Sequence, residues 1–331
     1  MRRLICLIMI CLGTIALHAK TVTDMAGRQV DIPDRVERVL PFDPKTSILI
    51  FPVLDEKMVA TCVLTGKKGY RFIDDRYRDM PEVDVKNIEA VLAANPQVLL
   101  YGIYSNTDNT EPVFKLGRRL NIPVLLVNLS IGRLDEAYSF LGTVFAVEEK
   151  CKPFISFLQA VYTEVDSLMK LSPDIKAEVY YSLGPTGFMT DPSGSRHTEV
   201  FDYLNISNVA KVDIPSGGHV KVNMEQVLFW NPEYIFTSNF MGENNAYSMI
   251  MSDSKWKSIR AVKNHHVYKV PSQPMSWFDH PPSINRVPGL IWLCGLFYNV
   301  DARVTQAEII RFYSLFYNYQ LSSAEYRTLF E

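Results

Sequence analysis

The chain has 331 residues, of which 47% are hydrophobic and 21% are charged, and its formal net charge is −2. This composition is that of a water-soluble globular protein, and it argues against disordered and membrane-embedded classes. The small net charge leaves no basic field for a polyanion, so we expect no nucleic-acid partner. A single core rarely grows much beyond about 250 residues, so the length favours two domains.

The first residues differ in kind from the rest of the chain. Two arginines precede an apolar run at 4–17, and Ala19 closes the segment. This order is typical of a secretory signal peptide, here 1–19, and the run is shorter than the roughly 20 residues that a membrane span needs. We therefore expect a mature protein in the periplasm. The alternative is a lipid anchor on Cys11, which is disfavoured because Ile10 stands where a small residue should precede the cysteine.

The remaining cysteines are Cys62, Cys151 and Cys294, an odd number within apolar stretches. They imply no disulfide framework, and no pair has the spacing of zinc ligands. We interpret them as core residues.

Short apolar runs alternate with helical patterns after the leader, which predicts βα units and parallel sheets. Most runs are too short and too evenly apolar for half-exposed strands, so we expect them at buried sheet centres. The predicted strands are 38–41, 58–64, 98–103, 123–127, 178–183, 234–238 and 267–270.

A long amphipathic helix is predicted at 147–171, where apolar residues recur every three or four positions. About 20 helical residues span roughly 30 Å, close to the diameter of a small domain. We interpret this helix as a strut between an N-terminal lobe at 20–146 and a C-terminal lobe at 172–331. An ordinary peripheral helix is the alternative.

An internal repeat lies on both sides of this helix. Residues 87–98 read NIEAVLAANPQV, and residues 223–234 read NMEQVLFWNPEY. Each copy predicts an asparagine N-cap, about two turns of helix, a stop at Asn-Pro and a buried strand. The repeat therefore predicts two lobes that are built alike.

Together with the repeat, two further segments resemble a known family. Residues 23–39, TDMAGRQVDIPDRVERV, are similar to its short N-terminal hairpin, and residues 256–271, WKSIRAVKNHHVYKVP, are similar to a stretch late in its chains. In this order and spacing, they resemble the two-lobed binding proteins of importers for ferric siderophores, haem, cobalamin and related metal compounds.

The resemblance implies an α/β fold of two Rossmann-like lobes with parallel sheets, joined by a single long α-helix, with a ligand cleft between them. It implies a monomer that binds a small metal chelate or an oxyanion and delivers it to the permease dimer of an ABC importer. A ferric siderophore is the default cargo. Haem or cobalamin, nickel, and molybdate or tungstate are alternatives, because residues 278–293, FDHPPSINRVPGLIWL, depart from the commoner pattern. No cofactor is expected, since a metal would arrive with the ligand.

Glu89 and Glu225 occupy the same position in the two repeats. A carboxylate there also interacts favourably with the helix dipole, which is the purely structural alternative. A capping box would place the acidic residue one position later, at Ala90 and Gln226. The resemblance implies that the two glutamates dock onto arginines of the two permease subunits.

Ligand contacts are expected in loops at the carboxyl ends of strands. The candidates are Asp43, Lys67, Tyr70 and Tyr104 in the first lobe, and Arg196, Trp277 and His280 in the second.

Three of these candidates suggest specific chemistry. Arg196 offers a planar fork for an anion, and Trp277 offers a large apolar face to an organic chelate. His280 is placed to ligate a metal or to hydrogen-bond a ligand, although a lone histidine more often does neither. His219 is a weaker candidate, and the histidine pair at 265–266 is expected at the surface.

The sequence contains none of the common hydrolase, phosphate-binding, metalloprotease or dinucleotide motifs. It also shows no compact cluster of metal ligands. We therefore expect no enzyme, with an exported enzyme that lacks a recognised motif as the alternative of another class.

Overall fold

The first lobe contains a parallel sheet in the order β3-β6-β7. The computed structural model describes residues 19–62, 70–214, 219–238 and 246–331. The strands of this sheet are β3 (Val39–Pro41), β6 (Val98–Ile103) and β7 (Val124–Asn128). Beside it lie a parallel pair and an antiparallel hairpin, formed by β4 (Thr61–Cys62) with β5 (Glu82–Val83), and by β1 (Ala19–Thr23) with β2 (Gln29–Pro33).

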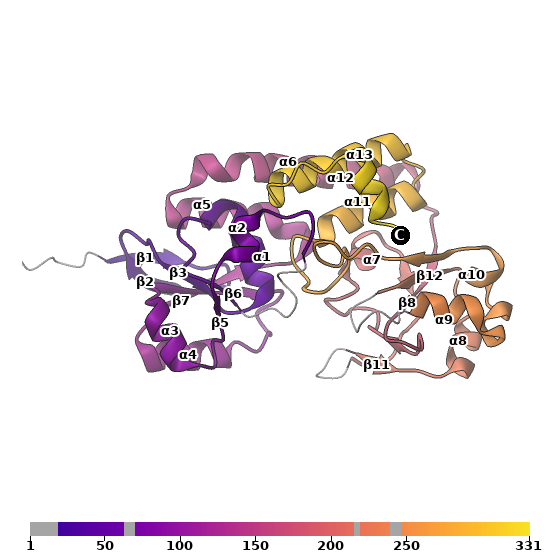
Figure 1. Cartoon of the computed structure of the whole chain (residues 1–331), viewed down its shortest axis with the longest axis horizontal. Coiled ribbons are helices and arrows are strands. Elements are labelled where there is room, and N and C mark those ends of the chain that lie inside the picture. Colours follow the sequence, from indigo (N-terminus) through magenta and orange to yellow (C-terminus); the bar gives the residue numbers. More distant parts are fainter. Residues whose placement is uncertain (1–18, 63–69, 215–218, 239–245) are drawn as a thin grey trace, which may run out of the picture.

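The second lobe repeats this plan with the strand order β10-β8-β12-β13, all parallel. Its strands are β8 (Glu178–Ser182), β10 (Ser207–Asn208), β12 (Tyr234–Thr237) and β13 (Val267–Lys269). A short antiparallel pair accompanies them, formed by β9 (Met189–Thr190) and β11 (Val220–Lys221). Figure 1 shows the two lobes side by side. The parallel α/β architecture predicted from the alternating pattern is therefore confirmed.

Short helices surround both sheets. In the first lobe they are α1 (Pro44–Leu54), α2 (Asp75–Asp79), α3 (Ile88–Ala94), α4 (Glu111–Leu120) and α5 (Leu134–Phe145), with a 3-10 turn η2 (Ile131–Arg133). In the second lobe they are α7 (Glu199–Tyr203), α8 (Met224–Trp230), α9 (Ala246–Ser252) and α10 (Arg260–Lys263), with η3 (Ser254–Ser258). None of the helices in the described part of the chain is both long enough and apolar enough to span a membrane.

The predicted long helix is α6 (Glu148–Leu171), which begins one residue later than expected. In Figure 1 it runs along one side of both lobes. Its buried face, which includes Phe154, Phe157 and Leu158, follows the helical period. Helix α6 therefore has the position expected of a strut.

The C-terminal helices pack beside α6 and return toward the first lobe. They are α11 (Arg286–Phe297), α12 (Ala302–Phe316) and α13 (Ser323–Thr328). Phe316 of α12 packs edge-on against Tyr138 of α5, with ring centres 5.8 Å apart. The backbone N–H of Asp74 donates to the carbonyl of Tyr317 at 2.8 Å. The end of the chain thus contacts both lobes, which adds a second connection beside α6.

The two repeats form matching helices, α3 and α8. Asn87 accepts a hydrogen bond from the backbone N–H of Ala90 at 3.1 Å, and Asn223 accepts one from that of Gln226 at 2.8 Å. Each helix ends on an asparagine in the left-handed conformation, and a buried strand follows. In Figure 1 both helices lie on the side of the molecule away from α6. The predicted internal repeat therefore corresponds to a structural one.

Candidate functional site

Two predicted ligand contacts of the first lobe, Asp43 and Tyr104, lie in segments that follow the buried strands β3 and β6. Asp43 caps α1, because its Oδ1 accepts a hydrogen bond from the backbone N–H of Thr46 at 2.8 Å, and it also forms an ion pair with Lys45. The Lys45 ammonium lies 4.3 Å from the centre of the Tyr101 ring. Asp43 thus already has a structural role, and its place as a ligand contact stays a prediction.

Tyr104 lies at the junction between the lobes. Its hydroxyl donates to the backbone carbonyl of Pro282, in the loop that leads into α11. The guanidinium of Arg196 lies 5.0 Å from the centre of its ring, and that of Arg286 lies 5.5 Å away. Burial raises the pKa of the Tyr104 hydroxyl well above its usual value. The ring therefore stays neutral and links loops of both lobes.

Arg196 bridges the two lobes across this junction. Its Nη2 lies 3.8 Å from Oδ1 of Asp108, and its side chain is 46% exposed. An ion pair at that distance and exposure contributes little to stability. The guanidinium is thus partly exposed at the junction, and its role as an anion contact stays a prediction.

A second arginine, Arg286, was not singled out in the sequence, and its side chain is fully buried. It forms an ion pair with Glu199 and donates to the carbonyl of Leu129 at 2.5 Å. Leu129 follows β7 in the first lobe, whereas Glu199 begins α7 in the second. Arg286 therefore ties the lobes together. The only sequence signal was an arginine inside an otherwise apolar helical run.

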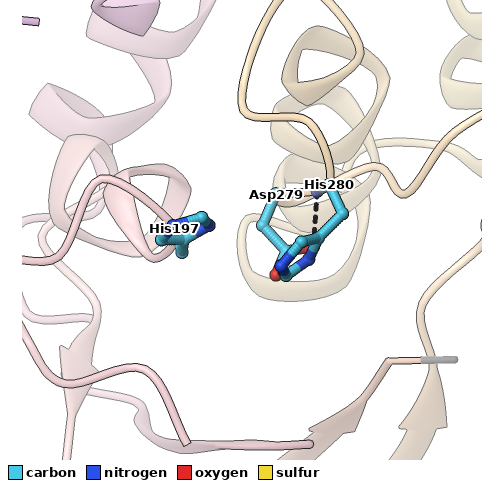
Figure 2. Close-up of side chains that lie close together, drawn as sticks. All are labelled: His197, Asp279 and His280. Carbon is cyan, nitrogen blue, oxygen red and sulfur yellow. Dashed lines mark hydrogen bonds and ion pairs between the residues drawn. The ribbon is translucent and has the colours of Figure 1, made fainter. Parts of the chain in front are cut away.

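Behind this junction the structure assembles a cluster that the sequence did not reveal (Figure 2). Three side chains, those of His197, Asp279 and His280, each offer one atom that can bind a metal, and these three atoms lie within 4.8 Å of one another. Nδ1 of His280 lies 2.5 Å from Oδ2 of Asp279. The structure therefore differs from the expectation of no compact metal-ligand cluster, because the fold brings together residues that are 82 positions apart in the chain.

His219 joins this cluster from the segment before β11. Its ring centre lies 5.7 Å from that of His197 and 5.6 Å from that of His280, while the latter two are 5.1 Å apart. Nδ1 of His219 lies 2.8 Å from Oδ1 of Asp191, whose side chain is fully buried. We call these five residues, His197, His219, His280, Asp191 and Asp279, the histidine cluster.

Burial controls the ionisation of this cluster. Burial and the charge of Asp279 raise the pKa of the Asp191 carboxyl to about 7. Burial also lowers the pKa of the His197 imidazole to about 4, although Asp279 opposes this shift. For Asp279, burial acts to raise the pKa of the carboxyl, but His280 and other partners hold it below its usual range. At neutral pH His197 is therefore neutral, which is the form that binds metals.

The position of Trp277 differs from the prediction. Its side chain is fully buried, and its indole N–H donates to the hydroxyl of Tyr313 at 3.0 Å. Phe278, in the same loop, is also fully buried and packs against Phe236 and Tyr181. The loop turns its aromatic side chains into the core because α11 and α12 cover that side. The buried indole therefore has no exposed surface for a ligand, and the set of residues that contact the ligand stays a prediction.

The other predicted residues have less informative positions. Tyr70 is partly buried and packs against the main core, and Lys67 lies outside the described residues. His265 is exposed, as expected, whereas His266 is partly buried and stacks on Tyr234. The three cysteines are buried, which confirms their interpretation as core residues.

Two cavities lie along α6 rather than at the lobe junction. One of about 660 Å³ is bordered by α1, α6 and α12, and one of about 320 Å³ lies between α6, α11 and α12. Neither is lined by any predicted site residue or by the histidine cluster.

Comparison with known proteins gives a consistent assignment. A family model described as periplasmic binding protein matches residues 79–274, which is more than half of the chain. The molybdate-binding protein MolA of Haemophilus influenzae is 24% identical over 312 residues, covering 86% of each chain. The high-affinity heme uptake system protein IsdE of Staphylococcus aureus is 23% identical over 245 residues, covering 71% of this chain and 80% of that protein.

Solved structures agree with this result. An ABC transporter solute-binding protein from Sulfurospirillum deleyianum has a TM-score of 0.80 and 26% identity, over 94% of this chain and 98% of its own. MolA of H. influenzae bound to molybdate has a TM-score of 0.68 and 20% identity, over 92% of this chain and 99% of its own. The two-lobed fold is thus shared with proteins that bind solutes outside the cytoplasm.

Proposed function

The chain belongs to the periplasmic binding protein family, and we propose that it delivers a compact metal species to the permease of an ABC importer. It is an extracytoplasmic substrate-binding component rather than an enzyme. We propose a compact cargo and a docking surface for the permease, and separate observations support each of them.

The lobe junction supports a compact cargo. Trp277, the aromatic residue that was expected to contact an organic chelate, is fully buried, and so is Phe278 beside it. The side chains gathered near the junction are instead polar, with three imidazoles and two buried carboxylates of the second lobe close to Arg196. A ferric siderophore, the default expectation, needs extended apolar contact that these groups do not offer. This set of polar side chains near the junction is the observation that carries the proposal of a compact cargo.

Molybdate is a second candidate because a relative that covers most of the chain is named as a molybdate-binding protein. Arg196 offers the exposed, planar guanidinium that an oxyanion would need. Titration with molybdate separates this candidate from a metal cation.

The matched helices α3 and α8 support a docking role for Glu89 and Glu225. Both carboxylates are exposed, and neither forms a hydrogen bond or ion pair within the part of the chain that the structure describes. At α8 a capping box is completed by Gln226, so Glu225 is not needed for capping. A permease arginine would therefore find two free carboxylates on the same side of the molecule.

Apolar side chains accompany both glutamates. Leu92 on α3 is 56% exposed, and the equivalent Leu228 on α8 is 43% exposed. Phe229, the next residue, is 87% exposed. Exposed large apolar side chains that recur at matched positions suggest an interaction surface rather than chance exposure. Each lobe thus presents a carboxylate next to an apolar contact.

We test docking by measuring uptake in cells that express the chain with its native permease. The probes are radioactive nickel, molybdate and a ferric hydroxamate. Replacing both Glu89 and Glu225 with alanine should abolish uptake of the transported probe, while its binding to the purified protein stays unchanged. Glu148→Ala is the matched control, because Glu148 is also an exposed acidic residue in a first helical turn, but on α6. Unchanged uptake in the double variant would contradict the docking role of both glutamates. A loss of ligand binding as large as the loss of uptake would also contradict it. Uptake of the ferric hydroxamate alone would contradict a compact cargo.

We also propose that the leader at 1–19 is cleaved. N-terminal sequencing should find a start near Lys20. A lipid-bearing start at Cys11 would instead establish the anchored alternative.

A further inference from the structure

We propose that the histidine cluster binds a divalent transition-metal cation directly, with His197, His219, His280 and Asp279 as ligands and Asp191 as a positioning residue. This deepens the proposed function and rests on it, because it names the compact cargo. The relatives' names mention molybdate and haem, and neither assigns these residues. Four observations support the site.

The first observation is the spacing of the rings. A metal about 2.0 to 2.1 Å from each imidazole nitrogen places the ring centres of three histidines roughly 5 to 5.5 Å apart. The three centre distances here are 5.1, 5.6 and 5.7 Å. The ligand atoms of His197, Asp279 and His280 already lie within 4.8 Å of one another.

The second observation is the orientation of His219. Its Nδ1 lies 2.8 Å from Oδ1 of Asp191, and the ionised form of that carboxyl accepts a hydrogen bond from Nδ1, which leaves the lone pair on Nε2. Histidines that bind metals are usually held by such a carboxylate on the other ring nitrogen. Asp191 sits fully inside the lobe, where it touches the ring but is shielded from solvent.

The third observation is a set of unsatisfied buried atoms. Oδ2 of Asp191 and Nδ1 of His197 are buried and form no hydrogen bond with any described residue. A buried polar atom without a partner costs free energy, and a metal ion bound to Nδ1 of His197 would supply that partner. Asp191 has no exposed surface, and its other oxygen already faces the cluster through His219.

The fourth observation is charge. Asp191 and Asp279 are both fully buried within one cluster, where two ionised carboxylates would repel each other, so a proton or a cation is favoured there. A dianion such as molybdate would add to this repulsion, whereas a divalent cation removes it. Imidazole ligands favour nickel, copper, zinc and iron over magnesium and calcium. The geometry therefore selects a borderline transition-metal cation over an oxyanion or a hard cation.

The test is calorimetric titration of the mature chain with nickel chloride, zinc chloride, magnesium chloride and sodium molybdate. We expect one nickel or zinc ion per chain, no magnesium binding and no molybdate binding at this cluster. Each of the single variants His197→Gln, His219→Gln and His280→Gln should bind nickel at least 100-fold more weakly than the parent. His265→Asn is the matched control and should leave the affinity unchanged, because His265 is exposed and lies outside the cluster.

Asp191→Asn tests the positioning role. Loss of the partner of a metal-binding histidine typically lowers affinity by about 10- to 100-fold, less than loss of a ligand. Asp191→Glu should restore part of the affinity. X-ray absorption of the nickel-loaded parent should show imidazole scattering from three histidines, a signature that does not depend on any variant folding.

Several results would overturn the site. These are nickel binding that survives all three histidine changes, an absorption spectrum with oxygen ligands only, or one-to-one molybdate binding with no nickel binding. In the last case the importer role would still stand, because uptake and the Glu89 and Glu225 variants test it separately.

Discussion

Replacing Arg286 with methionine should destabilise the protein strongly. The buried guanidinium forms an ion pair with Glu199 and donates to the carbonyl of Leu129 at 2.5 Å. It also donates to the carbonyl of Ser283 at 3.2 Å. The methionine side chain fills similar space but donates to none of these groups.

The magnitude follows from burial. Breaking a buried ion pair by removing one partner typically costs about 3 to 5 kcal/mol, because a buried charge is left unpaired. Here the partner Glu199 keeps 25% of its side chain exposed, so water compensates part of that loss. We therefore expect the lower end of the range, about 3 kcal/mol.

Urea unfolding of the ligand-free protein measures this change, followed by tryptophan fluorescence. The midpoint should fall while the slope stays constant. Arg303→Met is the control, because the side chain of Arg303 is 91% exposed and its loss should leave the midpoint nearly unchanged. If Arg286→Met is no more destabilising than this control, the ion pair with Glu199 and the hydrogen bond to Leu129 do not stabilise the contact between the lobes.

Three further predictions follow from the same packing. Small-angle scattering should show no compaction when nickel chloride is added, because α6 and α12 both connect the lobes, and a large decrease in the radius of gyration would contradict this. Trp277→Phe should lower the free energy of unfolding by about 1 kcal/mol through loss of the hydrogen bond to Tyr313, without changing nickel affinity; a tenfold weaker affinity would place Trp277 at the ligand after all. Burial raises the pKa of Cys151 to about 11 and that of Cys294 to about 12, so both thiols should react with a disulfide reagent at pH 8 only after unfolding; fast reaction of the folded protein would show that they are accessible.

Local patterns predicted the main parallel strands and the long helix of the fold. The strand at 98–103 has the predicted bounds, and the long helix begins one residue later than expected. Both signals depend on residues that are close in sequence, namely a buried apolar run and a helical period. The two-residue strands β9, β10 and β11 were missed, because so short a segment carries no periodicity.

The candidate site was harder to predict because it depends on contacts between distant segments. His280 and Arg196 were identified as candidates from their loops, but His197 next to Arg196 was not singled out. Trp277 resembled a ligand contact because an aromatic loop after a strand often is one. Its burial depends on Tyr313, 36 residues later, which no local pattern reveals.

Metal binding by the histidine cluster is tested most directly by metal analysis and mass spectrometry of the protein purified from its native source without added metal. We predict about one equivalent of a divalent transition metal and no organic chelator. In a protein in which the three histidines of the cluster are changed to glutamine, that metal should be absent. Recovery of the parent with haem, a ferric siderophore or molybdenum, and with no divalent transition metal, would contradict direct metal binding by the histidine cluster.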